Sequence, residues 1–304
     1  MRLAFLGTPE AAVVSLRALV EAGHDVGIVV TRPDRRRGRG GALVASPVKR
    51  AAREMGLPVS DDLGAVREAR VERGVVVAYG ALVPAALLAE VPMLNVHFSL
   101  LPRWRGAAPV ARAILAGDAE TGVDVISLEA SLDTGPIHAE ARVPIAEKTL
   151  SELTGELAEL GSRLLIEVLA NASLLAHPHA QIGEVIYARK LDATDFAIDP
   201  SMDVARAARV ARLEASRVTI AGRRLRIVSA HVDHESAAQP PAGGVGVTRA
   251  VSLGFDDGAL VLDRVQPDGG RVMTSAAWWA GARLVEPLRW EGAIRPDGPV
   301  GSGA

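Results

Sequence analysis

An amide and an imidazole stand two residues apart in a short apolar stretch of this chain, at Asn95 and His97. Side chains at positions i and i+2 of a β-strand point to the same face, so the two groups are predicted to project together. An amide can donate a hydrogen bond to a developing oxyanion, and an imidazole can move protons near neutral pH. The pair suits acyl transfer. For the pair alone, an Asn and a His that only bind nearby backbone groups remain an open alternative.

A carboxylate in a glycine-containing turn, Asp133 within Leu132–Ile137, is the third candidate. Near His97 it could orient the imidazole and support its charged form. Taken alone, an Asx-turn residue that caps its own loop is the better interpretation of Asp133. Asn is a poor ligand for transition metals, and the sequence has neither an H-E-x-x-H pattern nor further histidines at ligand spacing, so no metal is expected.

Several common enzyme classes are excluded by what the sequence lacks. The first apolar run ends in Gly7-Thr8-Pro9-Glu10, which is not the G-x-G-x-x-G that a dinucleotide pyrophosphate requires. There is no G-x-x-x-x-G-K-[ST] string, so a P-loop enzyme is not expected. The chain has no cysteine, which excludes disulfides, thiolate metal sites and cysteine nucleophiles.

The elements that must position these residues are those of an α/β sheet. Apolar runs at 3–6 and 26–31 flank a helical pattern at 11–22, as in a βαβ unit. Further apolar runs at 75–78 and 94–96 do not alternate with polar residues, which is typical of parallel strands covered on both faces. The second of these runs ends beside Asn95 and His97, at the edge where open α/β sheets bind ligands.

The next segments add strands at 121–128 and 139–145 and a helix. Thr149-Leu150-Ser151-Glu152 is a capping box and predicts where that helix begins. The apolar stripe expected to face the core comprises Leu150, Leu153, Leu157, Leu160, Leu164 and Val168.

The second part of the chain has a different pattern. A helix is expected over 205–213, and short strand-like runs follow, separated by Gly222, Gly243-Gly244, Asp257-Gly258 and Gly269-Gly270. That spacing predicts a small antiparallel barrel. The expected strands are 218–221, 225–230, 251–253 and 259–262. The predicted fold class is therefore α/β, with a Rossmann-like, mostly parallel sheet domain followed by a smaller β-rich, OB-like barrel domain.

Bulk composition sets wider limits. The 304 residues are 49% hydrophobic, enough to bury one large or two ordinary cores, and the net charge of −2 does not indicate a nucleic-acid partner. Seven arginines nevertheless lie within Asp203–Arg226, and such a run by itself is typical of a solvated face. No signal peptide or membrane span is expected, which predicts a cytoplasmic protein.

The motifs together resemble the formyltransferases that use 10-formyltetrahydrofolate, and among them those that act on methionyl-tRNA. The resemblance is carried by the strings N-V-H and S-L-L-P-R-W-R-G-A-A-P within Asn95–Pro109, S-L-D-T-G-P-I around Asp133, and Y-A-R-K-L at Tyr187–Leu191. Shorter matches include Phe5–Pro9 and Gly281–Leu284.

The resemblance implies roles for particular residues. The family's catalytic trio falls on Asn95, His97 and Asp133. Ser99, Leu100, Leu101 and Pro102 would line the folate site, and the loop of Tyr79, Gly80, Ala81 and Leu82 would wall the pterin pocket. The reaction implied is formyl transfer from 10-formyltetrahydrofolate to initiator methionyl-tRNA for translation initiation, without a metal or a covalent enzyme intermediate. A formyltransferase for a small amine such as an amino sugar or a biosynthetic intermediate is the alternative, and a noncatalytic tRNA- or folate-binding protein is a third.

The family's tRNA-reading loop falls on 34–49. The residues expected to bind tRNA are Arg35, Arg36, Arg37, Arg39, Lys49, Arg209 and Arg212. The expected organisation is a catalytic domain over residues 1–187, a linker over 188–203 and a tRNA-binding barrel over 204–304. We further expect a monomer with no membrane association.

One residue and two segments depart from the family's pattern. Phe98 stands where many members have Gly, and as a strand neighbour it should point away from Asn95 and His97. Gly40-Gly41-Ala42 replaces the basic residues that often follow Arg39. After the first helix of the second domain the family usually turns through Pro and Gly, whereas 212–217 here has neither, so the helix either continues or turns by other means.

Overall fold

The structure is a computed structural model that describes residues 1–37, 41–233, 239–284 and 288–292. By its internal contacts the chain divides into two units. The first comprises Met1–Val110, Glu120–Pro144 and Leu153–Arg189, and the second comprises Ala111–Ala119, Ile145–Glu152 and Lys190–Ala304. Within the described ranges no helix is long and apolar enough to cross a membrane.

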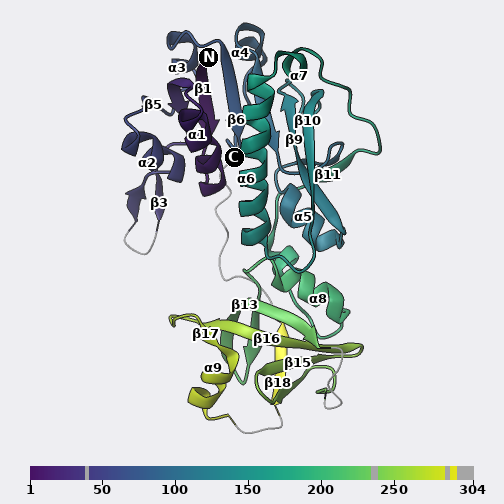
Figure 1. Ribbon diagram of the computed structural model, residues 1–304. Coiled ribbons are helices and arrows are strands. Elements are labelled where there is room, and N and C mark those ends of the chain that lie inside the picture. Colours follow the sequence, from purple (N-terminus) through teal and green to yellow (C-terminus); the bar gives the residue numbers. More distant parts are fainter. Residues whose placement is uncertain (38–40, 234–238, 285–287, 293–304) are drawn as a thin grey trace. The chain divides into compact units, whose positions relative to one another are not determined.

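The first unit is built on a seven-stranded sheet in the order β10-β9-β7-β6-β1-β2-β5 (Figure 1). Five neighbouring strands, β5, β2, β1, β6 and β7, are parallel. Strand β9 is antiparallel to both β7 and β10. The bounds are β1 Arg2–Gly7, β2 Asp25–Val30, β5 Val59–Ser60, β6 Arg73–Val77, β7 Met93–His97, β9 Glu120–Ser127 and β10 Ile137–Pro144. The predicted α/β sheet is confirmed.

Helices and short strands also lie along residues 10–188, and of these most of α5 and the first residues of α6 belong to the second unit. The helices are α1 Glu10–Glu21, α2 Pro47–Glu54, α3 Ala65–Glu68, α4 Ala85–Glu90, α5 Pro109–Ala116, α6 Leu150–Ala170 and α7 Ala172–Ala176. Two short strands, β3 Arg35–Arg37 and β4 Ala42–Val44, form an antiparallel hairpin, while β8 Arg103–Gly106 and β11 Ile186–Ala188 form a parallel pair. As predicted, α1 begins after Pro9, and Gly23 follows it with a φ of +79°.

Helix α6 begins at the predicted capping box. Thr149 N donates to Glu152 Oε2 at 2.9 Å, and Glu152 N donates to Thr149 Oγ1 at 3.3 Å. The predicted buried stripe was partly wrong, because Leu160 and Leu164 are only half-buried while Gly161 and Leu165 are buried. A Cβ on Gly161 would lie 2.7 Å from Val96 and 2.8 Å from Val123. Close approach of the helix to the sheet at this glycine therefore decides which face is covered.

The second unit is a closed antiparallel barrel. Its ring runs β13-β12-β18-β14-β15-β16, and β16 pairs back with β13 to close it. The bounds are β12 Arg217–Ile220, β13 Arg223–Asp233, β14 Gly244–Val247, β15 Val251–Phe255, β16 Gly258–Pro267, β17 Met273–Thr274 and β18 Leu288–Gly292, with helices η1 Ala193–Phe196, α8 Val204–Ala211 and α9 Ser275–Ala282. Phe255 and Trp290 meet in its core, with ring centroids 5.2 Å apart. The predicted barrel is confirmed, with six strands in the ring.

The turn after α8 is made without proline or glycine. The helix ends at Ala211, and Glu214 takes a left-handed φ of +60°. The Glu214 carboxylate accepts hydrogen bonds of 2.8 Å from both the backbone N and the Oγ of Ser151. These bonds stabilise a conformation that a non-glycine residue rarely adopts. The helix therefore does not continue, and the turn is rebuilt around Glu214.

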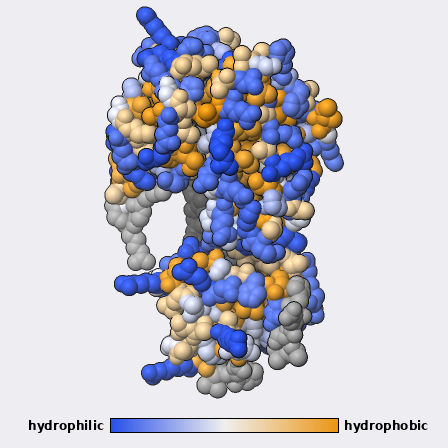
Figure 2. Space-filling view, in the orientation of Figure 1, coloured by the Kyte–Doolittle hydropathy of each residue, from blue (hydrophilic) through white to orange (hydrophobic). Residues whose placement is uncertain are grey.

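Most large apolar side chains of the described residues are buried. Figure 2 shows hydrophilic residues spread over the visible face, with hydrophobic residues in smaller areas between them. The exposed large apolar side chains are Met1, Leu43, Leu82, Leu132, Ile182, Val185 and Tyr187. Leu82 lies in the predicted pterin loop and Leu132 precedes Asp133, so part of this exposed apolar surface borders the predicted site.

Candidate active site

Strand β7 presents Asn95 and His97 together. Both side chains are buried, and their neighbour Val96 points to the other face, toward Gly161 of α6. Phe98 also lies on the α6 side, with its ring 3.7 Å from the position of a Cβ on Gly161. As predicted, Phe98 therefore points away from Asn95 and His97.

The turn after β9 brings Asp133 to the same place. Asp133 Oδ1 accepts from Asn95 Nδ2 at 3.4 Å, and Asp133 Oδ2 lies 3.7 Å from His97 Nδ1. The backbone N of Gly106 also donates to Oδ2, at 2.8 Å. Asp133 itself has a φ of +52°, a conformation that Asp tolerates better than most residues. The structure thus brings the three predicted catalytic side chains together.

The imidazole of His97 is held in one tautomer. Its Nε2 lies 3.0 Å from the carbonyl oxygen of Trp104. A carbonyl can only accept, so Nε2 must carry hydrogen, and in the neutral ring Nδ1 is then the free base. Nδ1 faces the Asp133 carboxylate. A proton taken up at Nδ1 would create an imidazolium beside an anion, which is the arrangement that general acid–base catalysis needs.

The two predicted folate segments follow neighbouring parallel strands. Tyr79–Leu82 comes after β6 and Ser99–Pro102 after β7, so both lie at the edge where such sheets bind ligands. Ser99 is buried and donates through Oγ to the carbonyl of Arg103 at 2.7 Å. Tyr79 is buried, and its carbonyl accepts from Thr8 Oγ1 at 2.8 Å, whereas Leu82 is 73% exposed. A flat ligand could therefore contact both the hydrogen-bonded backbone of these loops and the exposed side chain of Leu82.

Asp124, a buried carboxylate that was not predicted from the sequence, lies beside this site. Asp124 of β9 is paired in register with His97 of β7, is fully buried, and accepts from Leu101 N through Oδ2 at 2.7 Å. The pKa of Asp124 is raised to about 7, mainly by burial and to a smaller extent by Glu140, while the Leu101 N–H and Arg142 act in the opposite direction. Its only sequence signal is an aspartate inside the apolar run Val123–Ile126.

We expect Asp124→Asn to stabilise the protein in a pH-dependent way. The pKa of Asp124 is raised from 3.8 to about 7 on folding, so the stability gained from its proton is full below pH 3.8 and lost as pH rises through 7. Asn keeps an acceptor for Leu101 N but carries no charge. At pH 8 the variant should melt about 2–4 °C above wild type, and the difference should shrink toward pH 5.

Thermal unfolding followed by circular dichroism at pH 5, 6, 7 and 8 measures this difference. Asp256→Asn is the matched control, because Asp256 is exposed in the barrel. The assignment is wrong if Asp124→Asn changes the melting temperature equally at every pH.

The residues predicted to bind tRNA have different surroundings. Arg35 and Arg36 are exposed on the β3–β4 hairpin, with Arg36 Nη1 donating to Gly41 O at 3.2 Å. Lys49 forms a 2.7 Å ion pair with Asp34. The side chain of Arg37 and all of Arg39 lie outside the described residues. Only Arg35 and Arg36 of this set are thus seen with exposed side chains on the hairpin.

The two arginines predicted in the second unit make contacts within that unit. Arg209 Nε donates to Leu115 O at 3.2 Å. Arg212 is 9% exposed, its Nη1 donates to Ala146 O, and burial lowers its pKa. A guanidinium that holds the backbone in this way is poorly placed to reach a phosphate, so Arg212 has an evident structural role.

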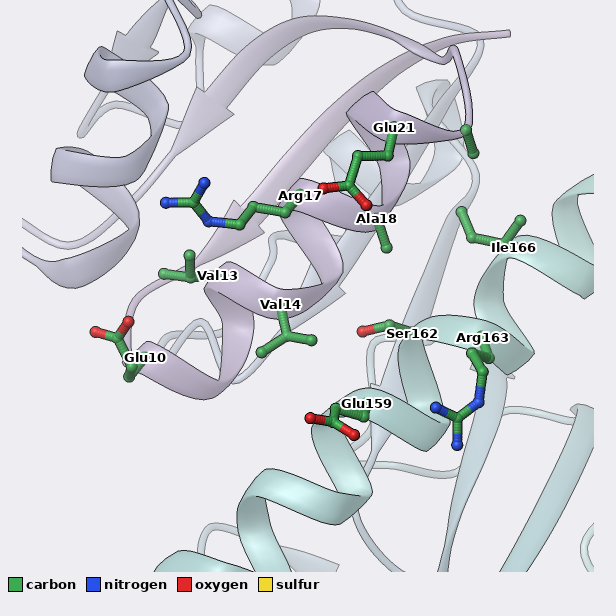
Figure 3. A pocket seen from close by; sticks show the side chains of 11 residues that line it. Glu10, Val13, Val14, Arg17, Ala18, Glu21, Glu159, Ser162, Arg163 and Ile166 are labelled. Atoms are coloured by element: carbon green, nitrogen blue, oxygen red, sulfur yellow. The ribbon is translucent and has the colours of Figure 1, made fainter.

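The groove in Figure 3 is a separate feature of the first unit. It measures about 680 Å³ and lies between α1 and α6. Its lining includes Glu10, Arg17, Glu159 and Arg163, and none of the residues predicted for catalysis or folate binding. The opposite face of the sheet, where Asn95 and His97 project, carries the candidate chemistry.

Comparison with protein families matches both parts of the chain. Residues 1–169 match the model described as formyl transferase, and residues 203–283 match the formyl transferase C-terminal domain. Methionyl-tRNA formyltransferase of Rhizorhabdus wittichii is 41% identical over 95% of this chain and 100% of its own length. The protein of the same name from Paracoccus denitrificans is 40% identical with the same coverage.

Two solved structures share the fold at low identity. The N-formyltransferase from Helicobacter canadensis, in complex with folinic acid and dTDP-3-aminofucose, has a TM-score of 0.65 at 16% identity, covering 86% of this chain and 98% of that one. HypX from Aquifex aeolicus in complex with tetrahydrofolic acid has a TM-score of 0.64 at 17% identity, covering 92% of this chain and 47% of that one. This chain spans about half the length of HypX.

A Rossmann-like sheet with Asn95, His97 and Asp133 at one strand end, followed by a barrel, is thus the architecture of a two-domain formyl transferase. Because the relatives named above are 40% and 41% identical over nearly the whole length, the chain belongs to the methionyl-tRNA formyltransferase family.

Proposed function

We propose that this protein transfers the formyl group of 10-formyltetrahydrofolate to the free amino group of initiator methionyl-tRNA. The observation that carries the proposal is the convergence of Asn95, His97 and Asp133 within 3.7 Å, in a chain that belongs to this family. We also propose that it acts in the cytoplasm as a monomer. No metal enters the proposed chemistry.

The reaction exchanges one C–N bond for another. The neutral amine attacks the formyl carbon, an oxyanion forms, and the bond to N10 of the folate then breaks. The N–H of Asn95 that does not face Asp133 is proposed to bind the oxyanion, and the positive charge of protonated His97 is proposed to stabilise it. The attacking amine loses one proton and N10 gains one. The His97–Asp133 pair is the proposed acid–base relay, acting directly or through water.

The proposed ligand contacts are the loops at the same edge of the sheet as Asn95 and His97. Ser99–Pro102 is proposed to line the folate site, and Tyr79–Leu82 to wall the pterin, whose donors and acceptors backbone groups can bind. The exposed apolar side chains of Leu82 and Leu132 would pack against the folate or the methionyl group. For the tRNA we propose the β3–β4 hairpin as the main contact of the first unit, with the phosphates as its partners.

Replacing both hairpin arginines should weaken tRNA binding while leaving the chemistry intact. For the double variant Arg35→Ala/Arg36→Ala we expect KM for the tRNA to rise roughly tenfold and kcat to change little. The slope of log KM against log salt should fall by about 2, one for each lost phosphate contact. Steady-state kinetics at 50–200 mM KCl measure both.

Arg163→Ala serves as the control, since Arg163 is an exposed arginine on α6. A double variant with unchanged KM and an unchanged salt slope would remove the hairpin from the proposed tRNA site.

The acceptor is tested by direct competition. Purified protein and 10-formyltetrahydrofolate are given equimolar initiator methionyl-tRNA and a nucleotide-linked amino sugar. We expect the formyl group on methionine. Formylation of the sugar alone would favour the small-amine alternative, and binding of either ligand without turnover would favour a noncatalytic protein.

A further inference from the structure

Residues 179–188, here called the strap, pair with two segments beside the candidate site, one near the Asp133 turn and one that follows β7. At one end His179 pairs with Ile137, through backbone hydrogen bonds of 2.8 and 2.9 Å, just after the Asp133 turn. At the other end β11 pairs with β8, and Ala188 O accepts from Ala107 N at 2.9 Å. The strap therefore lies against the segment that follows β7 and the segment that follows β9.

Gln181 in the strap joins these two segments through its side chain. Its Nε2 donates to Asp133 O and to Gly135 O, both at 2.8 Å. Its Oε1 accepts from Nε and Nη2 of Arg105, at 3.0 and 2.6 Å. A primary amide offers two donor hydrogens and two acceptor lone pairs, so all four are used. Such a fully bonded side chain fixes its partners more firmly than a single contact does.

Arg105 belongs to β8, the strand whose backbone contacts both His97 and Asp133. In β8, Trp104 O binds Nε2 of His97, and Gly106 N donates to the Asp133 carboxylate. The Arg105–Gln181 contact lies between these two. One end of Gln181 is thus tied to β8, which orients His97, and the other to the backbone of the turn that carries Asp133.

The conformation of Asp133 also needs external support. Its left-handed φ of +52° is uncommon for a residue with a Cβ, and the two carbonyls that Gln181 binds flank Thr134 at the centre of the turn. A loss of these bonds would let the turn relax. The carboxylate could then move relative to His97 Nδ1, and a displacement of about 1 Å can cost 10²-fold in rate.

We propose that Gln181 is a positioning residue for formyl transfer, which sets the place of the Asp133 carboxylate relative to His97 by tying the Asp133 turn to Arg105. The proposal rests on the proposed function, because it assigns Gln181 a part in that reaction. Gln181 acts through the backbone and is not itself expected to touch the reacting atoms. Its effect should therefore appear in the rate of the chemical step and not in substrate binding.

Two substitutions separate the possible roles of the side chain. Gln181→Leu removes every hydrogen bond at similar volume, while Gln181→Glu keeps an acceptor for Arg105 but cannot donate to Asp133 O and Gly135 O. We expect both to lower kcat by about 10- to 100-fold, with KM for folate and for the amine within about threefold of wild type. The matched control is Gln266→Leu, since Gln266 Nε2 donates to a single backbone carbonyl, Gly270 O, in the barrel.

The rates are measured with whichever amine the wild-type protein formylates, so the acceptor does not decide the outcome. Wild-type protein that formylates no amine would overturn the proposed function, independently of any variant. With active wild type, kcat within twofold for both Gln181 variants would overturn the positioning role. A rise in KM with unchanged kcat would also overturn it, as would failure of both variants to fold while Gln266→Leu folds.

Discussion

Replacing His97 by alanine or Asp133 by asparagine should lower kcat for formyl transfer by about 10²–10⁴-fold. His97 Nδ1 and Asp133 Oδ2 lie 3.7 Å apart, and Trp104 O holds the far side of the ring, so each substitution removes one half of the proposed acid–base pair. Both variants should fold, since neither removes a core apolar side chain. Single-turnover kinetics with saturating substrates measure the chemical step, and circular dichroism checks the fold.

The barrel supplies a control of the same chemistry. His231 Nδ1 lies 3.1 Å from the Asp263 carboxylate, in an exposed pair outside the candidate site. His231→Ala should keep kcat within twofold of wild type. A His97→Ala variant that is equally active would remove His97 from the mechanism.

Gly135→Ala should be the most damaging single-methyl change near the site. A Cβ at Gly135 would lie 1.8 Å from Ser127 O, so the turn must move. That movement would disturb the hydrogen bond of Ser127 N to Pro136 O and the bond that Gln181 makes to Gly135 O. We expect the free energy of unfolding to fall by about 1–3 kcal/mol. The displaced Asp133 should lower kcat by about 100-fold. Urea unfolding and single-turnover kinetics measure the two effects.

Gly155→Ala is the matching control for that change. Gly155 is exposed on α6, and a Cβ there would meet no atom of the described residues within 4 Å apart from its chain neighbours and the backbone of its own helix. Ala is a better helix former than Gly, so this variant should gain about 0.5–1 kcal/mol and keep full activity. Equal behaviour of the two variants would contradict the close packing of the turn at Gly135.

Strand β7, which carries Asn95 and His97, was the most predictable part of the candidate site. Alternation of side chains along a strand is a local property, so Asn95 and His97 could be placed on one face without a structure. The position of Asp133 is not local. It depends on a turn that folds back over β7, and only the resemblance to a family indicated it.

Two residues near the candidate site, Gln181 and Asp124, make tertiary contacts that were not predicted from the sequence. Gln181 is separated by 48 residues from Asp133 and by 76 from Arg105, and nothing in its own segment marks it. Asp124 carries a signal, a charge inside an apolar strand, but its partner is a backbone N–H on another loop. Such partners become visible only when the chain has folded.

The same dependence on tertiary contacts explains why the buried face of α6 was partly wrong and why β14 and β18 were not predicted. On α6 the apolar pattern placed Leu160 and Leu164 in the core, but the sheet approaches most closely at Gly161, which has no side chain to count as apolar. In the barrel, β14 is Gly-Val-Gly-Val and β18 carries Arg289 and Glu291, so neither shows the apolar run expected of a strand. Pairing with β15 and β12 makes them strands.

The central claim is that Asn95, His97 and Asp133 move a formyl group from folate to methionyl-tRNA. It is tested most directly with 10-formyltetrahydrofolate labelled at the formyl carbon, incubated with initiator methionyl-tRNA and the protein, followed by release of the amino acid from the tRNA. With wild-type protein the label should be recovered in formyl-methionine, and with His97→Ala it should stay on the folate over the same period. Label that never reaches methionine with wild type, or reaches it equally fast with His97→Ala, would contradict the account.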